Sequence, residues 1–236
     1  MTDPVDVTLS RLAAHADAER AAFTAGYHPT SARILGVPTG ALRAIARQLR
    51  DETRGLPLAE LLALAQRLIA TEVHEGRQVA YELLAAHRGL PALLTRAELE
   101  VLGQGMDNWV SVDTFSCSLA GGALRAGGLQ AADLLDWARS PDRWWRRAAL
   151  VTTTGWNKRS HGGRGDVPRT LLVCRALVAD RDEFVVKALS WALRDLVVWD
   201  PGAVRAFLEA EPVAARVKRE VTTKLETGRK GGVRMA

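Results

Sequence analysis

The chain has 236 residues, of which 47% are hydrophobic and 25% charged, an ordinary composition that is long enough to bury a substantial core. No stretch approaches the roughly 20 apolar residues of a membrane span, and the N-terminal MTDPVDVTLS lacks the basic and apolar regions of a secretory signal. The only two cysteines, Cys117 and Cys174, indicate neither a disulfide framework nor a zinc site. We therefore expect a cytoplasmic protein without a metal or cofactor.

The charge is unevenly distributed along the chain. Residues 1–140 contain 13 Arg and no Lys against 16 Asp and Glu, whereas residues 141–236 contain 19 Lys and Arg against 11 Asp and Glu. A basic half of this kind indicates a polyanionic partner such as nucleic acid. Arginine-rich helices that are simply well solvated would give the same count.

The predicted secondary structure is almost entirely helical. Sustained apolar/polar alternation and Asn-Gly turns do not occur in the sequence, whereas Ala, Leu, Arg and Glu recur with helical spacing. In chain order, the clearest helical segments are residues 41–50, 58–70 and 169–179. Loops are predicted at residues 54–57, 88–91, 124–130, 139–143, 158–168 and 199–202.

An internal repeat connects four of the predicted helices. Aligning His74, Trp109, Trp144 and Phe184 gives steps of 35, 35 and 40 residues. Helix pairs that repeat at about this length are typical of HEAT-like α-solenoids. The predicted fold class is therefore all-α, an α-solenoid (superhelix) of HEAT-like helical repeats.

This repeat is expected to fill one domain, over residues 1–228, followed by a basic, flexible tail at residues 229–236. In the alignment, the position four residues after Trp109 is Asp113, so an indole and a carboxylate share one helix face. Further along the same alignment, cations and a second indole also fall on one face. A concave surface is thus predicted to carry Trp109, Asp113, Arg147, Lys187, Trp191 and Arg194.

Each of these residues also has a purely structural interpretation. Trp109 and Trp191 could pack between helices, since burial of indole rings is common. Asp113 could belong to a structural ion pair, and Arg147 could be solvated or ion-paired rather than bound to phosphate. The glycine-rich loop at residues 162–166 is too short for a phosphate-binding P-loop and is expected to be a flexible connector.

Five segments, in order and at matching separations, resemble the AlkD-type bacterial DNA alkylation-repair glycosylases, which are built from HEAT-like repeats. The resemblance extends from about residue 18 to about residue 228. The segments are YHPTSARILGVPTGALRAIAR at 27–47, NWVSVD at 108–113, WWRRAAL at 144–150, FVVKALSWALRD at 184–195 and VKREVTTKLETG at 217–228.

The resemblance implies an enzyme that excises cationic N3- and N7-alkylated purines, such as 7-methylguanine and 3-methyladenine, from double-stranded DNA. It implies a catalytic role for Asp113, with Trp109 and Trp191 facing the DNA. It also implies that the enzyme works without flipping the damaged base into a pocket. We further expect a monofunctional enzyme that is a monomer and acts in the bacterial cytoplasm, at the nucleoid. The DNA-binding residues that it implies are Arg147, Arg194, Tyr27 and Thr39, joined by Lys187 and by Lys158 or Arg159.

One region departs from the family pattern. Where the family often has a lysine soon after the WxxR helix, this chain has Gly155 to Lys158, followed by a longer HGGRGD loop that looks like an insertion. Two other functions also fit the sequence. One is a non-catalytic HEAT-like protein that binds branched or damaged DNA, and the other is a scaffold whose concave face binds a partner helix.

Overall fold

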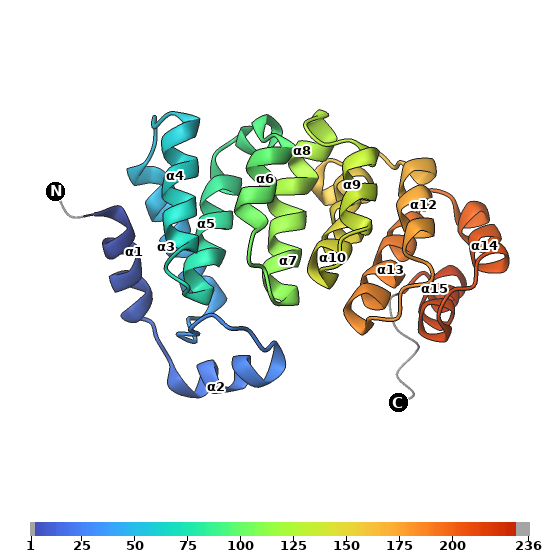
Figure 1. Ribbon diagram of the computed structural model, residues 1–236, viewed down its shortest axis with the longest axis horizontal. Coiled ribbons are helices and arrows are strands. Elements are labelled where there is room, and N and C mark those ends of the chain that lie inside the picture. The colour runs from blue at the N-terminus through green and yellow to red at the C-terminus, as the bar shows by residue number, and fades with distance from the viewer. Residues whose placement is uncertain (1–2, 230–236) are drawn as a thin grey trace. The chain divides into compact units, whose positions relative to one another are not determined.

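A computed structural model describes residues 3–229 of the chain, except the side chain of His161. Within these residues the regular structure is helical apart from one isolated bridge between Arg33 and Val73 (Figure 1). The chain divides into two compact units, Met1–Ala123 and Leu124–Ala236. None of the described helices is long and apolar enough to cross a membrane.

The first unit contains three tightly packed helices at its centre. The helices α3 and α4 both pack against α5, and Figure 1 shows the three side by side. In α3 the buried residues Leu42, Ile45, Ala46 and Leu49 are three or four positions apart, which places them on one stripe facing α5. The elements of this unit are α1 (Pro4–Ala13), α2 (Ala18–Tyr27), α3 (Thr39–Glu52), α4 (Leu58–Ile69), α5 (His74–Ala86), η1 (Leu90–Leu93), α6 (Arg96–Gly103), α7 (Trp109–Phe115) and the π-helix η2 (Ser116–Ala120).

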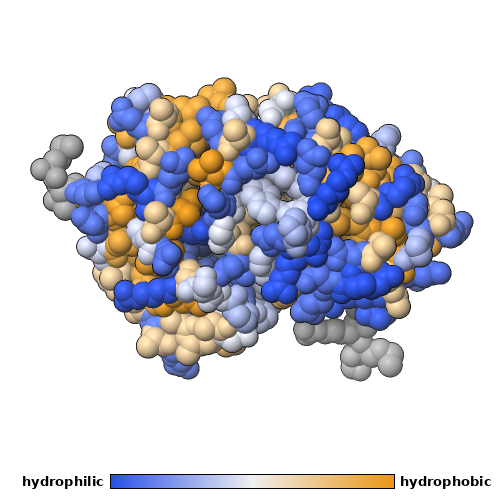
Figure 2. All heavy atoms as spheres, in the orientation of Figure 1, coloured by the Kyte–Doolittle hydropathy of each residue, from blue (hydrophilic) through white to orange (hydrophobic). Residues whose placement is uncertain are grey.

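Helix α2 differs from its neighbours because none of its residues is buried. Its aromatic side chains are exposed, Phe23 by 73% and Tyr27 by 65%. In Figure 2 the surface over α2, at the lower left, is mildly hydrophobic. The position of this helix therefore depends on the segments at its two ends rather than on an apolar stripe.

The second unit repeats the same packing scheme. Helix α10 packs against α9 and α13, and α13 packs against α15. Figure 2 shows that the lower edge of this unit, over α10, α13 and α15, is mostly hydrophilic. Its elements are α9 (Ala131–Ala138), α10 (Arg143–Thr152), α11 (Thr154–Asn157), η3 (Arg159–His161), α12 (Val167–Ala176), α13 (Glu183–Leu196), α14 (Pro201–Ala210) and α15 (Ala215–Thr227), while α8 (Gly121–Ala126) spans the division between the units.

The predicted repeat alignment is confirmed at the level of the helices. His74 and Trp109 are the first residues of α5 and α7, and Trp144 and Phe184 are the second residues of α10 and α13. The aligned residues therefore occupy the same turn of four helices. The all-α solenoid class is confirmed, whereas the HEAT-like character of the repeats stays a prediction.

The extent of the predicted domain stays a prediction as well. Residues 230–236 of the predicted tail lie outside the described residues.

Candidate functional site

Helix α7 begins at Trp109 because the preceding residue, Asn108, caps it. The Asn108 side-chain oxygen accepts a hydrogen bond from the Ser111 amide at 3.0 Å, and its amide group donates to the Ser111 hydroxyl at 3.2 Å. Gln78 of α5 donates to the same hydroxyl at 3.2 Å. The first turn of α7, and with it Trp109, is thus attached to α5.

Asp107 connects this turn to the segment that follows α2. Its carboxylate accepts hydrogen bonds from the Thr30 hydroxyl at 2.6 Å and from the Ser31 amide and hydroxyl at 2.5 and 2.8 Å. Burial opposes ionisation of this carboxyl group, but the hydrogen bonds from Thr30, Ser31 and Asn108 outweigh it and lower its pKa. This anchor holds the end of α2 beside α7.

As a result, the indole of Trp109 is contacted by rings from the end of α2. Tyr27 meets it edge-on, with centroids 5.6 Å apart, and His28 does so at 5.7 Å. Phe23 stacks on the outer side of Tyr27, with centroids 6.1 Å apart and ring planes 15° from parallel. The rings form a row that runs from exposed Phe23 inward to half-buried Trp109.

Two histidines lie behind this row. The rings of His28 and His74 are 5.2 Å apart, and both ring nitrogens of His28 are buried without a hydrogen-bond partner among the described residues. Burial lowers the pKa of both imidazoles, while the nearby carboxylate of Glu75 opposes this change. Both rings are therefore neutral around pH 7.

Asp113 lies one helical turn after Trp109 and is half-buried. Three residues later the helix widens into the π-helix η2, a feature that often accompanies functional sites. Thr39 is exposed at the first turn of α3. The segment that leads to it is held by the buried Glu75, which accepts hydrogen bonds from three consecutive amides, those of Leu35, Gly36 and Val37.

In the second unit, Arg147 is buried, with an exposed fraction of 6%. It donates a hydrogen bond from its NH1 atom to the carbonyl of Phe184 at 2.6 Å, which joins α10 to the first turn of α13. Lys187, one turn further along α13, pairs with Glu183 at 3.2 Å and lies 5.0 Å from the centre of the Phe184 ring. A third cation, Arg143, lies 4.9 Å from the ring centre of Trp144.

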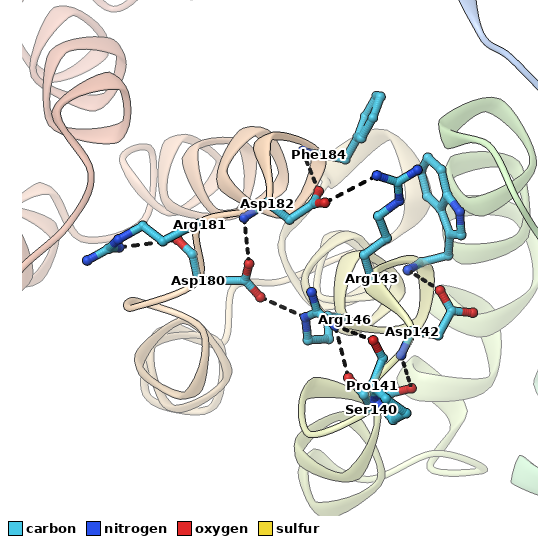
Figure 3. A network of polar contacts seen from close by, with 10 residues as sticks. Ser140, Pro141, Asp142, Arg143, Arg146, Asp180, Arg181, Asp182 and Phe184 are labelled. Atoms are coloured by element: carbon cyan, nitrogen blue, oxygen red, sulfur yellow. Dashed lines mark hydrogen bonds and ion pairs between the residues drawn. The ribbon is translucent and has the colours of Figure 1, made fainter.

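Figure 3 shows how the turns before α10 and α13 are joined. Arg146 donates to Asp180 at 2.7 Å and to the carbonyls of Ser140 and Pro141 at 3.1 and 2.8 Å. Arg143 contacts Asp182, the residue that caps α13. These contacts fix the N-terminal ends of the two helices, whose first amides are capped by the carboxylates of Asp142 and Asp182.

Trp191 lies elsewhere on α13, with its indole half-buried. Its N–H donates to the carboxylate of Asp195, one turn along the helix, at 3.1 Å. Burial raises the pKa of Asp195, and the charges of Lys158, Arg194 and Lys224 oppose that rise. The hydrogen bond fixes the orientation of the indole.

Arg194 is buried and pairs with Glu220 of α15 at 2.6 Å rather than with its neighbour Asp195. Its guanidinium group also contacts the Ser190 hydroxyl. Lys158 lies nearby, at a hollow of about 290 Å³. The residues that line this hollow are Asn157, Lys158, Arg159, Ser160, Arg194, Asp195, Val198 and Lys224.

Residues 162–166 make defined contacts with the rest of the second unit, whereas their expected role as a flexible connector stays a prediction. Asn157 accepts a hydrogen bond from the Asp166 amide at 2.9 Å and donates to the Thr170 hydroxyl at 2.8 Å. The Trp199 indole donates to the Asn157 carbonyl at 2.8 Å and packs against Gly165. The loop is therefore held at both of its ends.

The candidate residues fall into two groups. The first unit contains Tyr27, Thr39, Trp109 and Asp113. In this group Tyr27 contacts Trp109, and Asp113 lies one turn after Trp109 on α7. Arg147, Lys158, Lys187, Trp191 and Arg194 belong to the second unit. Lys158 and Arg194 line one hollow there, while Arg147 and Lys187 contact Phe184. That both groups act on one surface stays a prediction.

Sequence analysis missed several residues of these sites. Asp107 and His28 act through contacts with segments about 80 residues away, and no local spacing indicates them. Phe23 could have been found, because it lies four residues before Tyr27 on the same helix. Asp195 could have been found, because it lies four residues after Trp191, the separation that places two side chains on one helix face. Within the part of the chain that the structure describes, no group of three or more His, Cys, Asp or Glu is arranged to hold a metal.

Comparison with known proteins agrees with the sequence resemblance. The family described as DNA alkylation repair enzyme matches residues 8–225. One similar solved structure is a predicted DNA alkylation repair enzyme from Enterococcus faecalis, with a TM-score of 0.76, 18% identity and coverage of 90% of this chain and 98% of that one. No curated protein matched the chain. Since the family match spans most of the sequence, this chain belongs to the DNA alkylation repair enzyme family.

Proposed function

We propose that this chain is a DNA glycosylase that removes cationic N3- and N7-alkylated purines, such as 7-methylguanine and 3-methyladenine, from duplex DNA. The observation that carries the proposal is the pair of Trp109 and Asp113, one turn apart on α7. The indole of Trp109 lies at the inner end of an exposed row of aromatic rings. An electron-rich ring and a carboxylate on the same helix face suit a substrate that becomes positively charged.

The chemistry needs few groups because the lesion is already cationic. Alkylation at N7 or N3 weakens the glycosidic bond and makes the base a good leaving group, so a strong general acid is not required. The remaining demand is a deoxyribose that gains oxocarbenium character in the transition state. A fixed carboxylate such as that of Asp113 would stabilise this charge more than the ground state, and it could also orient the attacking water.

The other residues would bind and position the DNA. The faces of Trp109 and Trp191 would contact the sugar of the lesion, with each cation–π contact contributing about 0.5–2 kcal/mol. Arg147, Arg194, Lys187 and Lys158 would bind backbone phosphates, which sets the position of the duplex without reading its sequence. Tyr27 and Thr39 would contact the DNA beside the lesion. We propose that the enzyme acts as a monomer in the cytoplasm, at the nucleoid.

The structure adds detail to two of these assignments. Because Arg147 and Arg194 are buried and bonded to protein groups, a phosphate would have to approach guanidinium groups whose positions the protein already sets. Lys187 is more exposed, and its partner Glu183 is an exposed residue one turn away, so a phosphate could replace that weak pair. The hydrogen bond from Trp191 to Asp195 would keep the indole face directed at the sugar.

The experiment measures base release from a duplex that contains a single 7-methylguanine, under single-turnover conditions. Asp113→Asn is expected to lower the rate by at least about 100-fold, the scale of losing one electrostatic contact to the transition state, while DNA binding is retained. Asp6→Asn, an exposed carboxylate of α1, serves as the matched control and is expected to behave as the wild type.

Release by the wild type with equal release by the Asp113→Asn variant would overturn the catalytic assignment of this residue. Binding of duplex DNA without release of either 7-methylguanine or 3-methyladenine would overturn the glycosylase proposal and favour the non-catalytic DNA-binding protein. We propose a monofunctional enzyme, which releases the base and leaves the strand intact, so strand cleavage together with base release would contradict this part of the proposal.

A further inference from the structure

The loop that departs from the family pattern borders a hollow of about 480 Å³ in the second unit. Its lining comes from the turn between α8 and α9, from Trp156 and from the 162–166 loop. Three arginines line it, Arg125, Arg164 and Arg169, against a single carboxylate, that of Asp166. The hollow is therefore electropositive, and none of the residues proposed above for the DNA alkylation repair site lines it.

The shape of this hollow is fixed by close backbone contacts. A Cβ atom on Gly163 would lie 2.6 Å from the carbonyl oxygen of Trp156, and one on Gly165 would lie 2.5 Å from the indole ring of Trp199. Gly165 also has a φ of +85°, which side chains other than glycine rarely adopt. The loop can take this path only with glycine at both positions, and Arg164 lies between them.

The three arginines differ in how far their charge is already balanced. Arg169 is paired with Asp166, to which it donates at 2.6 Å, and it also covers the ring of Trp156 at 4.7 Å. Arg164 is exposed, and the described part of the chain offers its side chain no hydrogen bond or ion pair. Its backbone amide is likewise without an acceptor there, whereas the amides of Gly162, Gly163 and Gly165 are all bonded.

Arg125 faces the loop from the α8–α9 side. Its NH1 atom contacts the carbonyl of Gly155 at 3.4 Å, and among the described residues no carboxylate pairs with it. Arg125 is exposed as a whole residue, and partial burial of its guanidinium group lowers the pKa of that group. Since Arg125 lines the hollow and its hydrogen bond is to a neutral carbonyl, an anion that enters the hollow can form a charge-assisted hydrogen bond with it.

We propose that the hollow between the α8–α9 turn and the 162–166 loop is a phosphate-binding site, in which Arg125 and Arg164 grip the anion from opposite sides. Guanidinium groups bind phosphate oxygens through two parallel hydrogen bonds, and the open amide of Arg164 supplies a further donor. Arg169 contributes its charge but stays paired with Asp166. The phosphate comes from the backbone of duplex DNA outside the lesion, and this part of the proposal rests on the proposed function.

The test compares the double variant Arg125→Gln/Arg164→Gln with the wild type in fluorescence anisotropy titrations of an unmodified duplex at several salt concentrations. The loss of two phosphate contacts is expected to reduce the slope of log K against log salt concentration by about two. Arg205→Gln on α14 removes an exposed arginine of the same unit and is the matched control, for which the slope is expected to remain unchanged. Circular dichroism shows whether each variant is folded.

A titration with inorganic pyrophosphate, followed by calorimetry, separates the two sources of phosphate. A reduced slope in the double variant supports a DNA backbone site, and this result does not depend on whether the wild type releases 7-methylguanine. In another outcome, the wild type binds pyrophosphate but not DNA, and the double variant loses the pyrophosphate binding. This result supports a site for a free phosphate compound, while the DNA function fails. Equal slopes together with no loss of pyrophosphate binding would overturn the proposal.

Discussion

Replacing Glu75 with glutamine tests how the segment between α2 and α3 is held. The buried carboxylate accepts hydrogen bonds from the amides of Leu35 at 3.0 Å, Gly36 at 2.8 Å and Val37 at 3.3 Å. A bond to a charged acceptor contributes about 1.5–3 kcal/mol, compared with about 0.5–1.5 kcal/mol for a neutral one. The three bonds together therefore lose about 3 kcal/mol when the charge is removed.

Part of this loss is offset, because the buried carboxylate itself costs free energy of desolvation that the glutamine does not. We therefore expect a net loss of about 2 kcal/mol, which corresponds to a roughly 30-fold larger equilibrium constant for opening of the segment and, where reclosing is fast, to equally faster exchange. Hydrogen exchange followed by mass spectrometry measures this directly in a peptide that contains the three amides. Glu75→Gln should accelerate exchange there by this factor.

Glu82→Gln provides the control on the same helix. Glu82 pairs with Arg43 at 3.5 Å near the surface, and such pairs contribute about 0–1 kcal/mol, so exchange of the same peptide should stay unchanged. If Glu75→Gln accelerates exchange by less than about threefold, which is well under 1 kcal/mol, the carboxylate does not hold the segment and the reasoning is refuted.

Two further predictions concern pH and the glycine-rich loop. Burial lowers the pKa of His28 and His74 from 6.5, so around this pH the unfolded chain binds more protons than the folded one. The free energy of unfolding should therefore fall as the pH drops below about 6.5. The expected slope is up to about 1.4 kcal/mol per pH unit for each histidine. Urea denaturation between pH 7.5 and 5.5 measures this, and a His28→Gln variant with an undiminished pH dependence would contradict it. Gly165→Ala should lower the free energy of unfolding by about 1–3 kcal/mol, since its backbone conformation and the ring of Trp199 both oppose a Cβ atom. Thermal melting compared with Gly26→Ala, a position with no atom within 4 Å of the added Cβ, checks this, and equal melting temperatures would show that the loop relaxes.

The substitutions of Glu75 and His28 act on parts that position the proposed chemistry. The segment held by Glu75 ends at Thr39, and the one held by Asp107 contains the residues that follow Tyr27. Loosening either segment would move the rings that contact Trp109. Base release should therefore respond to changes at residues that never touch the substrate.

The sequence by itself determined the helical class and the repeat. Periodicity of apolar residues depends on neighbours three and four positions away, so α3, α4 and α12 were predicted from local composition. The alignment of Trp109 with Phe184 was also predictable, because each repeat packs on the next in the same way and places equivalent residues in equivalent turns. The capping of α7 by Asn108 follows equally local rules.

The tertiary structure decided which side chains meet. The contact of His28 with Trp109 joins residues 81 positions apart, and no spacing rule covers such a distance. The burial of Arg147 and the pairing of Arg194 with Glu220 likewise depend on which helix lies opposite. Residues 162–166 were expected to be a flexible connector, and the close approach of the Trp199 ring to Gly165 could not be predicted from local sequence. Long-range packing, rather than local propensity, therefore determined where the charges and rings of this protein can act.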